Sequence, residues 1–388
     1  MKIFIFYLAQ TPVKPILPAW LRTLCQFDVT RRLAIKQSHE VDCFRYVDET
    51  GLQVAKLMAI KSELKIPQTD VGIYLGHKYI EANQKITKEE AGKVKLQLEK
   101  TPYAKRFLEP SIKEQEKFFE VLGFYNAPIF WEGTLNKSLP QLIKTLKKEN
   151  RLLDYSKYKG DKFLDFTDFG LKLITLKGKN GYTFIAKLLL NMMKIVQKGY
   201  DLIILQNIDE DQHPYKYLEK YLTLKNVDYI TLASARILLE GSAKSSRFGG
   251  WEPYTVDKII KRFSDFDLPD FRVGLRLYFL AFKNDFTRFE FKYDDLRQNI
   301  VFAKKACMFL AKFNADKITK DRVETNDENV KKMMHLLTDT KTLKQPSRIA
   351  NAYKMFLGQT KNAAKKGVDI EKEGYIYVLN SLRELLGG

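Results

Sequence analysis

Cysteine and histidine are both scarce in this sequence. Its 388 residues include three cysteines, Cys25, Cys43 and Cys307, and four histidines, no two of which lie four residues apart. A disulfide framework and a zinc ribbon both require closely spaced ligands, so the sequence predicts neither and no metal site of this kind. The scattered cysteines favour a reducing, intracellular compartment.

Long hydrophobic runs are missing as well. No stretch approaches the roughly 20 apolar residues that a membrane-spanning helix needs. The apolar run at residues 3–9 is at the lower limit of the roughly 7–15 residues of a signal-peptide core, and Thr11-Pro12 follows it. We therefore interpret this run as an opening β-strand and expect no membrane partner. The location expected is the cytoplasm, or an organellar or viral nucleoprotein.

The common catalytic signatures are absent too. The sequence contains no GxSxG, HExxH, GxxxxGK[ST] or GxGxxG motif and no pattern typical of a cysteine nucleophile. These absences exclude a recognisable serine hydrolase, zinc protease, P-loop enzyme or dinucleotide-binding fold. No motif in the chain fixes a reaction.

Positive charge is abundant. The chain has 66 Lys and Arg against 47 Asp and Glu, a net charge of +19. Such a surplus attracts polyanions through counterion release, which indicates DNA or RNA as a partner, together with other proteins where the chain belongs to a nucleoprotein complex. The alternative is that the charge only maintains solubility. Apolar residues at 45% and aromatic residues at 13% exclude a disordered chain.

The patterning predicts an α/β (α+β) protein in several parts. We expect an N-terminal α+β domain over residues 1–134, with an antiparallel meander at 31–60 and helices from 87 to 120. A helical linker follows at 135–160, then a central α/β domain at 161–294 that ends in a second meander. Residues 295–388 read as a C-terminal helical region.

The central segment is the most regular unit. A strand at 169–176, a helix at 184–199, a strand at 201–208, a helix at 213–222 and a strand at 228–234 follow one another. The nearly unbroken apolar run at 201–208 is typical of a strand that is buried on both faces. This order predicts a β-α-β-α-β unit.

The loop that opens the first of these helices is a candidate ligand site. It comprises Gly178, Lys179, Asn180, Gly181, Tyr182 and Thr183. Free backbone N–H groups and the positive end of the helix dipole suit a phosphate or pyrophosphate. The alternative is that the glycines only turn the chain.

Residues 161–234 resemble the core of the GNAT acyltransferase fold in the order of their elements. In the GNAT loop pattern [QR]xxGx[GA], Gly178 stands at the Gln/Arg position, Gly181 matches and Thr183 replaces the small residue. The resemblance implies a mixed sheet with flanking helices, with acyl-CoA as the cofactor of this loop.

The same resemblance bears on a catalytic residue. Such proteins often carry FYEKLGF on their second helix, where the tyrosine is the general acid. The matching stretch here is YLEKYLT, which places Leu218 at the tyrosine position with Tyr217 and Tyr221 nearby. An echo, FFEVLGF at 118–124, has Phe119 there. The resemblance implies Tyr217 or Tyr221 as general acid, or a degenerate fold kept for binding.

Two further groups of residues carry alternatives. Asp209 and Asp211 follow a strand, as in nucleotide-sugar glycosyltransferases that hold a divalent ion, but carboxylates also cap helix N-termini. Candidate nucleic-acid contacts combine lysines and arginine with aromatic side chains: Lys244, Arg247, Phe248, Trp251, Lys361, Lys365 and Lys366. Phe248 and Trp251 are also compatible with packing inward on the sheet.

Two functions therefore remain open. The first is a basic nucleic-acid-associated protein on a GNAT-like scaffold, as a subunit of a nucleoprotein assembly. The second is an enzyme, either a GNAT-like acyltransferase that modifies nucleic acid or a nucleic-acid-bound partner, or a glycosyltransferase.

Overall fold

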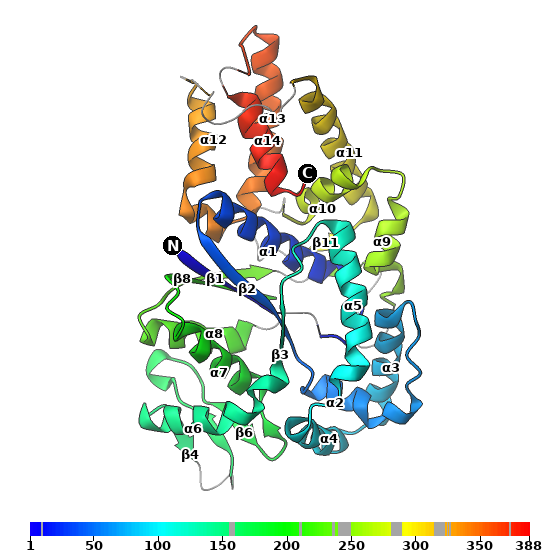
Figure 1. Ribbon diagram of the computed structural model, residues 1–388, viewed down its shortest axis with the longest axis vertical. Helices are drawn as coiled ribbons and strands as arrows, with labels where there is room; N and C mark the ends of the chain where they lie inside the picture. Colours follow the sequence, from blue (N-terminus) through cyan, green and yellow to red (C-terminus); the bar gives the residue numbers. More distant parts are fainter. Residues whose placement is uncertain are drawn as a thin grey trace.

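A parallel β-sheet lies at the middle of the molecule in the computed structural model (Figure 1). The structure describes residues 1–8, 11–154, 160–208, 212–234, 237–239, 250–280, 289–313, 323, 325, 327–371 and 374–388. The C-terminal helices occupy one end of the molecule. Helices α2–α4 and a small antiparallel sheet occupy the other.

The main sheet has five parallel strands in the order β3-β2-β1-β8-β9. Their bounds are Lys2–Leu8 for β1, Glu40–Val47 for β2, Ile129–Trp131 for β3, Leu202–Ile208 for β8 and Asp228–Ser234 for β9. In the centre, Ile5 pairs with Cys43 on one side and Ile204 on the other. Residues 3–7 are at most 2% exposed, which explains the apolar run at the N-terminus.

Helices cover both faces of this sheet. Helix α1 (Pro18–Lys36) packs on the face that carries Ile3 and Ile5, together with α10 (Leu268–Leu280). Helices α7 (Phe184–Val196) and α8 (Gln212–Leu224) pack on the face that carries Phe4 and Phe6. This layering confirms the α/β class and the predicted helix-strand-helix-strand order from 184 to 234.

A helical insert joins β2 to β3. It comprises α2 (Leu52–Ala59), α3 (Val71–Lys85), α4 (Lys88–Lys100) and α5 (Lys105–Leu122), and α2–α5 share a third apolar core. Helix α4 begins with a capping box, in which the Thr87 hydroxyl accepts from the Glu90 N–H and the Glu90 carboxylate accepts from the Thr87 N–H.

A second sheet follows β3. Helix α6 (Leu139–Lys148) leads into four antiparallel strands in the order β4-β5-β6-β7, which are Leu152–Asp154, Lys162–Leu164, Ile174–Gly178 and Gly181–Tyr182. The strand predicted at 169–176 thus belongs to this small sheet and does not pair with β8.

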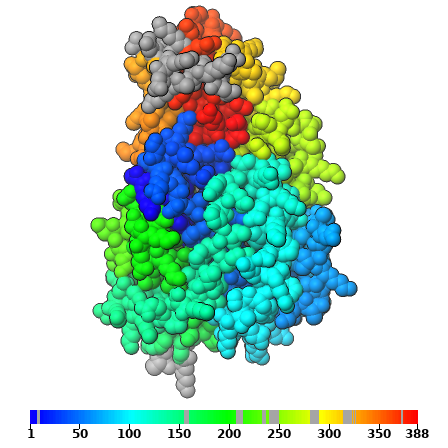
Figure 2. Space-filling view, viewed as in Figure 1, coloured from blue at the N-terminus to red at the C-terminus, as the bar shows by residue number. Residues whose placement is uncertain are grey.

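The C-terminal part of the described chain is mainly helical. After β10 (Ile237–Leu239), α9 (Val256–Arg262), α10 and β11 (Phe289–Phe291) come α11 (Tyr293–Leu310), α12 (Glu328–Thr338), α13 (Ser347–Lys365) and α14 (Tyr375–Leu385). In the space-filling view these helices sit directly on the N-terminal segment (Figure 2). A buried ion pair joins them to it, because Arg276 of α10 lies 2.6 Å from Asp28 of α1.

Both predicted meanders are wrong. Residues 31–36 continue α1, 40–47 form a parallel strand, and 52–59 form α2, where Val54, Leu57 and Met58 bury one face at helical spacing. The apolar run at 273–280 is the buried helix α10. A short, uniformly apolar run does not distinguish a buried strand from a buried helix.

The mixed sheet of GNAT type is also wrong. The main sheet is wholly parallel, and β1 of the expected N-terminal domain pairs with β8 of the expected central domain. The sheet therefore combines strands from both sides of the segment 135–160.

None of the helices in the described part of the chain is long and apolar enough to cross a membrane.

Candidate functional site

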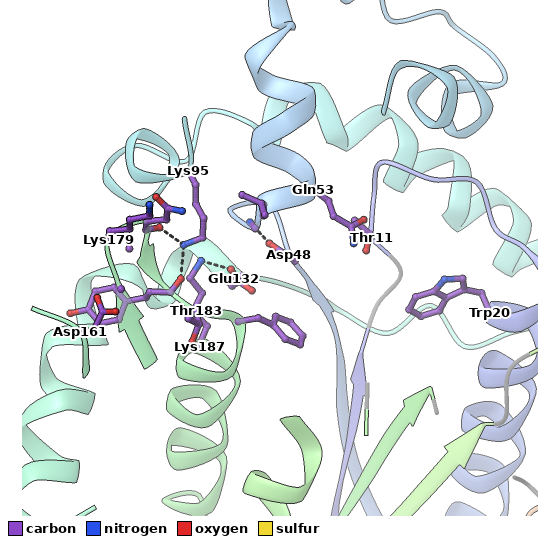
Figure 3. A pocket seen from close by; sticks show the side chains of 17 residues that line it. Thr11, Trp20, Asp48, Gln53, Lys95, Glu132, Asp161, Lys179, Thr183 and Lys187 are labelled. Carbon is purple, nitrogen blue, oxygen red and sulfur yellow. Dashed lines mark hydrogen bonds and ion pairs between the residues drawn. The ribbon is translucent and has the colours of Figure 1, made fainter. Parts of the chain in front are cut away.

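A polar pocket of about 570 Å³ opens beyond the carboxyl ends of β1, β2 and β3 (Figure 3). This is where ligands generally bind in open α/β sheets. We call it the Lys187 pocket. Its lining comes from all three strand ends, α1, α2, α4, the residue before β5, the β6–β7 hairpin and α7: Thr11, Trp20, Asp48, Gly51, Leu52, Gln53, Lys95, Glu132, Asp161, Gly178, Lys179, Asn180, Gly181, Tyr182, Thr183, Phe184 and Lys187.

Lys187 is the centre of a buried charge network. Its side chain is 1% exposed, and Nζ lies 2.5 Å from Oε1 of Glu132, which is equally buried. The same ammonium donates to the Thr50 hydroxyl. Glu132 also accepts hydrogen bonds from the hydroxyls of Thr50 at 2.7 Å and Tyr46 at 2.9 Å. The network thus joins the ends of β2 and β3 to the first turns of α7.

A second lysine, Lys95 of α4, connects α4 to the β6–β7 hairpin. Lys95 Nζ lies 2.6 Å from Glu99 Oε1 and donates to the carbonyl oxygens of Asn180 and Tyr182. Glu99 in turn accepts from the Tyr182 N–H at 3.1 Å. Gly181 has φ +86°, and a Cβ there would lie 2.3 Å from Glu99 Oε2, so this position requires glycine.

Burial and like charge raise the pKa values of two carboxyl groups, Asp48 in the lining of the pocket and its chain neighbour Glu49. Burial, together with the nearby Glu132, raises the pKa of Asp48 to about 7, although Lys187 and the N–H groups of Gly51 and Thr50 oppose this. The same two causes raise the pKa of Glu49 to about 8. These two carboxyl groups therefore bind protons near neutral pH, whereas a carboxylate whose charge is balanced by cations and hydrogen bonds would stay ionised.

The pKa values of Lys187 and Lys95 are shifted in opposite directions. Burial acts against the charge of Lys187, but Glu132 and Asp48 outweigh it, so the pKa of Lys187 is raised. Burial and the neighbouring Lys187 lower the pKa of Lys95 despite its partner Glu99. The pocket thus presents both charge signs, with Lys95, Lys179 and the carboxylate Asp161 on the hairpin side and Asp48 on the β2 side (Figure 3).

Two of the helices that begin at the pocket, α1 and α7, differ in their capacity to bind anions. At the start of α1, Pro18 has no N–H, and the N–H groups of Trp20 and Leu21 donate to the Leu17 carbonyl. The Trp20 side chain covers that side of the pocket. The start of α7 instead lies beside Lys179 and Lys187, so a bound anion is favoured on the hairpin side.

The predicted phosphate loop lies in this pocket. All six residues, Gly178 to Thr183, line it. Thr183 is the residue before α7, and its hydroxyl donates to the Thr175 carbonyl rather than facing a ligand. Phosphate binding by the loop stays a prediction.

The two predicted catalytic tyrosines lie elsewhere. Tyr217 and Tyr221 are 1% and 3% exposed, and neither is among the residues that line the pocket. The Tyr217 hydroxyl donates to the Lys172 carbonyl and its ring stacks on Phe166. Burial raises the pKa of both phenols above the ordinary range. Their role as general acids was implied only by the GNAT resemblance.

The remaining predicted residues fall into three groups. Trp251 is 2% exposed and turns inward, where it packs against Gly76 and His77 of α3, whereas the alternative interpretation placed it on the sheet. Lys361 and Lys365 line an open groove of about 520 Å³ between α11 and α13, where Lys361 Nζ lies 5.6 Å from the Phe309 ring centroid, and Lys366 follows at the end of α13. Outside the described residues lie Lys244, Arg247, Phe248, Asp209 and Asp211.

The sequence analysis missed the residues that build the pocket. Lys187 lies between apolar residues, after FIA and before LLL, which is a signal for a buried partner, because an unpaired buried lysine is costly. Its partners Thr50, Glu99 and Glu132 are distant in sequence and carry no motif. Among the described residues, no group of His, Cys, Asp and Glu is arranged to hold a metal ion.

Comparison with solved structures identifies the fold. The Thermus thermophilus arginyl-tRNA synthetase matches all of this chain and 80% of its own, with a TM-score of 0.71 at 15% identity. The Plasmodium falciparum arginyl-tRNA synthetase matches all of this chain and 76% of its own, with a TM-score of 0.69 at 14% identity. A Mycobacterium tuberculosis methionyl-tRNA synthetase bound by methionyl-adenylate matches with a TM-score of 0.57 at 10% identity, over all of this chain and 90% of its own.

These similarities concern the fold. No protein-family model and no curated protein sequence matches the chain. The likeness to aminoacyl-tRNA synthetases overturns the GNAT resemblance, and with it the acyltransferase, the GNAT-like nucleic-acid-binding scaffold and the glycosyltransferase. The local order of elements misled because many α/β folds share a β-α-β-α-β segment and differ in which strands lie beside it.

Proposed function

We propose that this chain is an aminoacyl-tRNA synthetase-like enzyme that binds an amino acid in the Lys187 pocket and a transfer RNA on its basic surface. The observation that carries the proposal is the likeness to arginyl-tRNA synthetases, which extends over the whole chain, C-terminal helices included. By their names those enzymes act on transfer RNA, and the methionyl enzyme was found with an aminoacyl adenylate.

The charges of the pocket support a ligand with both signs. Asp48, on the β2 side, has only backbone N–H groups as its described hydrogen-bond partners and is positioned to bind an ammonium or guanidinium group. Lys179, exposed on the hairpin, and the start of α7 are positioned to bind a carboxylate or phosphate. An amino acid or its adenylate has both kinds of group.

The surface charge supports the RNA half of the proposal. A net charge of +19 favours a polyanion. The groove beside α13 adds a local arrangement for RNA, because the charges of Lys361 and Lys365 border the Phe309 ring. An aromatic ring beside cations suits a stacked base with its phosphate.

Amino-acid-dependent ATP–pyrophosphate exchange tests the first half. We expect exchange with one or a few of the standard amino acids, arginine being the first to test. Asp48→Asn and Lys179→Gln should each reduce the rate roughly tenfold or more, since each removes a charge that contacts the ligand. Lys198→Gln, just beyond the other end of α7, is the matched control and should leave the rate unchanged.

Filter binding of bulk transfer RNA at several salt concentrations tests the second half. The dissociation constant should rise linearly with salt on a log–log plot, and Lys361→Gln/Lys365→Gln should lower the slope by about 1–2. Exchange without RNA binding would refute the RNA half alone. The absence of exchange with every amino acid would refute the enzymatic half.

A further inference from the structure

Four acidic side chains and two lysines meet at the inner wall of the Lys187 pocket. They are Asp48 and Glu49 after β2, Glu132 after β3, Lys95 and Glu99 in α4, and Lys187 in α7. We call these six residues the Lys187 network. If all of them were ionised, four carboxylates would face two ammonium groups in a largely buried place. A buried excess of one charge is costly unless a proton or a cation neutralises it.

Both lysines of the network already have acidic partners. Lys187 Nζ lies 2.5 Å from Glu132 Oε1, and Lys95 Nζ lies 2.6 Å from Glu99 Oε1. The second carboxylate near Lys187 is also that of Glu99, at 3.8 Å. The two carboxyl groups after β2 therefore lie beyond ion-pair distance of either lysine.

These two carboxyl groups each have one oxygen atom without a described hydrogen-bond partner. Asp48 Oδ1 accepts from the N–H groups of Thr50 at 3.1 Å and Gly51 at 2.5 Å, whereas Oδ2 accepts from no described residue. Glu49 is 2% exposed, and its Oε1 accepts from the Gly133 N–H at 2.8 Å. The buried Oε2 of Glu49 has no partner in the described part of the chain. A proton on such an oxygen removes the cost of an uncompensated charge.

Of the two groups, Asp48 lines the pocket and Glu49 does not (Figure 3). The charged and titratable groups that face Asp48 are Tyr46 and Glu49 of its own segment, Glu132 after β3 and Lys187 of α7, with Lys95 and Glu99 of α4 next to Lys187. Burial and the nearby Glu132 raise the pKa of Asp48 to about 7, against the effect of Lys187. A ligand in the pocket can therefore reach this carboxyl group.

We propose that Asp48 holds a proton in the ligand-free chain and releases it to solvent when the cationic group of the amino acid binds. The proton leaves Oδ2, and the ammonium or guanidinium group of the ligand replaces it as the neutralising charge. The balance of charge in the Lys187 network thus stays the same before and after binding. This inference rests on the proposed function, which supplies the amino acid.

The exchange makes binding depend on pH in a defined direction. The cation binds the ionised form of Asp48, which is the minor form below the pKa of about 7. The association constant should therefore fall by about tenfold for each pH unit below 7 and should be constant above 8. The pocket would then lose its ligand on acidification.

Titration calorimetry with L-arginine counts the released protons. The heat of binding is measured in two buffers of different ionisation enthalpy, and the difference between the two heats gives the number of protons exchanged. With a pKa of about 7, the full-length chain should release about 0.9 protons at pH 6 and about 0.5 at pH 7.

Three variants separate Asp48 from its neighbours. Asp48→Asn has the shape of the protonated group, so its binding of L-arginine should release no proton and should not change with pH. Glu49→Gln should still release a proton, because Glu49 does not line the pocket. Asp161→Asn is the matched control, since Asp161 lines the hairpin side outside the Lys187 network, and it should leave the number of protons unchanged. Melting curves verify that every variant folds.

Three outcomes would overturn the inference and leave the proposed function standing. L-arginine could bind the full-length chain at pH 6 without proton release, or with the same affinity at pH 6 and pH 8. Proton release could also persist in Asp48→Asn and disappear in Glu49→Gln. If L-arginine does not bind at either pH, the amino-acid half of the proposed function fails for arginine, and the inference fails with it.

Discussion

Replacement of Lys187 by methionine tests the charge network that builds the pocket. Methionine keeps most of the length and the apolar contacts of the lysine stem, so the main change is loss of the ammonium group. Glu132 would remain 1% exposed, with Asp48 and Glu49 near it. The substitution therefore leaves a buried carboxylate without its cation.

The expected cost follows from what Glu132 retains. Removing one partner of a buried ion pair generally destabilises a protein by about 3–5 kcal/mol. The hydroxyls of Tyr46 and Thr50 still donate to Glu132, so we expect the lower end, about 3 kcal/mol. In Lys187→Met/Glu132→Gln both charges are absent, and the cost should be smaller than in the single variant.

Urea unfolding at pH 7, followed by far-UV circular dichroism, measures these differences. Lys93→Met is the reference, because Lys93 forms an exposed pair with Glu89 at 3.7 Å and such pairs contribute little. If Lys187→Met lowered the free energy of unfolding no more than Lys93→Met, or if the double variant were the least stable, the network would not hold the pocket together.

Two further predictions concern pH and close packing. The pKa values of Asp48 and Glu49 in the folded chain are raised to about 7 and about 8, so the folded chain binds protons that the unfolded chain has released. The free energy of unfolding should therefore fall as pH rises from about 5 to about 8. Asp48→Asn should make this dependence on pH weaker. A free energy of unfolding that rises with pH over that range would contradict this prediction. Gly274→Ala should destabilise the protein by about 1–3 kcal/mol, since the new Cβ would lie 2.5 Å from Cα of Ile300. Gly358→Ala, at an exposed position of α13, should stabilise it by about 0.5–1 kcal/mol, and melting temperatures that shift in the same direction would refute the pair.

The sequence predicts the elements whose pattern is local. The run at 201–208 is apolar on both faces, and α7 follows a loop with Gly181 at a left-handed turn, so this part of the fold was accessible from spacing alone. The C-terminal helices were accessible for the same reason. The short run at 52–59 was not, because its length and composition suit a strand as well as a helix.

The neighbours of β1 and the partners of Lys187 could not be predicted. Strand order in a parallel sheet depends on crossover connections that leave no local signal. Lys187 contacts Thr50 and Glu132, and lies 3.8 Å from Glu99, each from a different part of the chain. The loop at 178–183 lies in the pocket, as its glycines suggested. The residues that surround the loop, and the type of fold, depend on these long-range pairings and could not be predicted from it.

The central position of β1 has a consequence for how the protein is made. β1 leaves the ribosome before the other strands of this sheet, yet one of its edges pairs only with β8, at Leu202–Ile208. Until β8 has been synthesised, the nascent chain exposes an apolar strand with an unpaired edge, which is a site of aggregation. Production of this chain therefore depends on what shields β1 during translation. The sheet cannot close around β1 until β8, more than half the described chain later, has been synthesised.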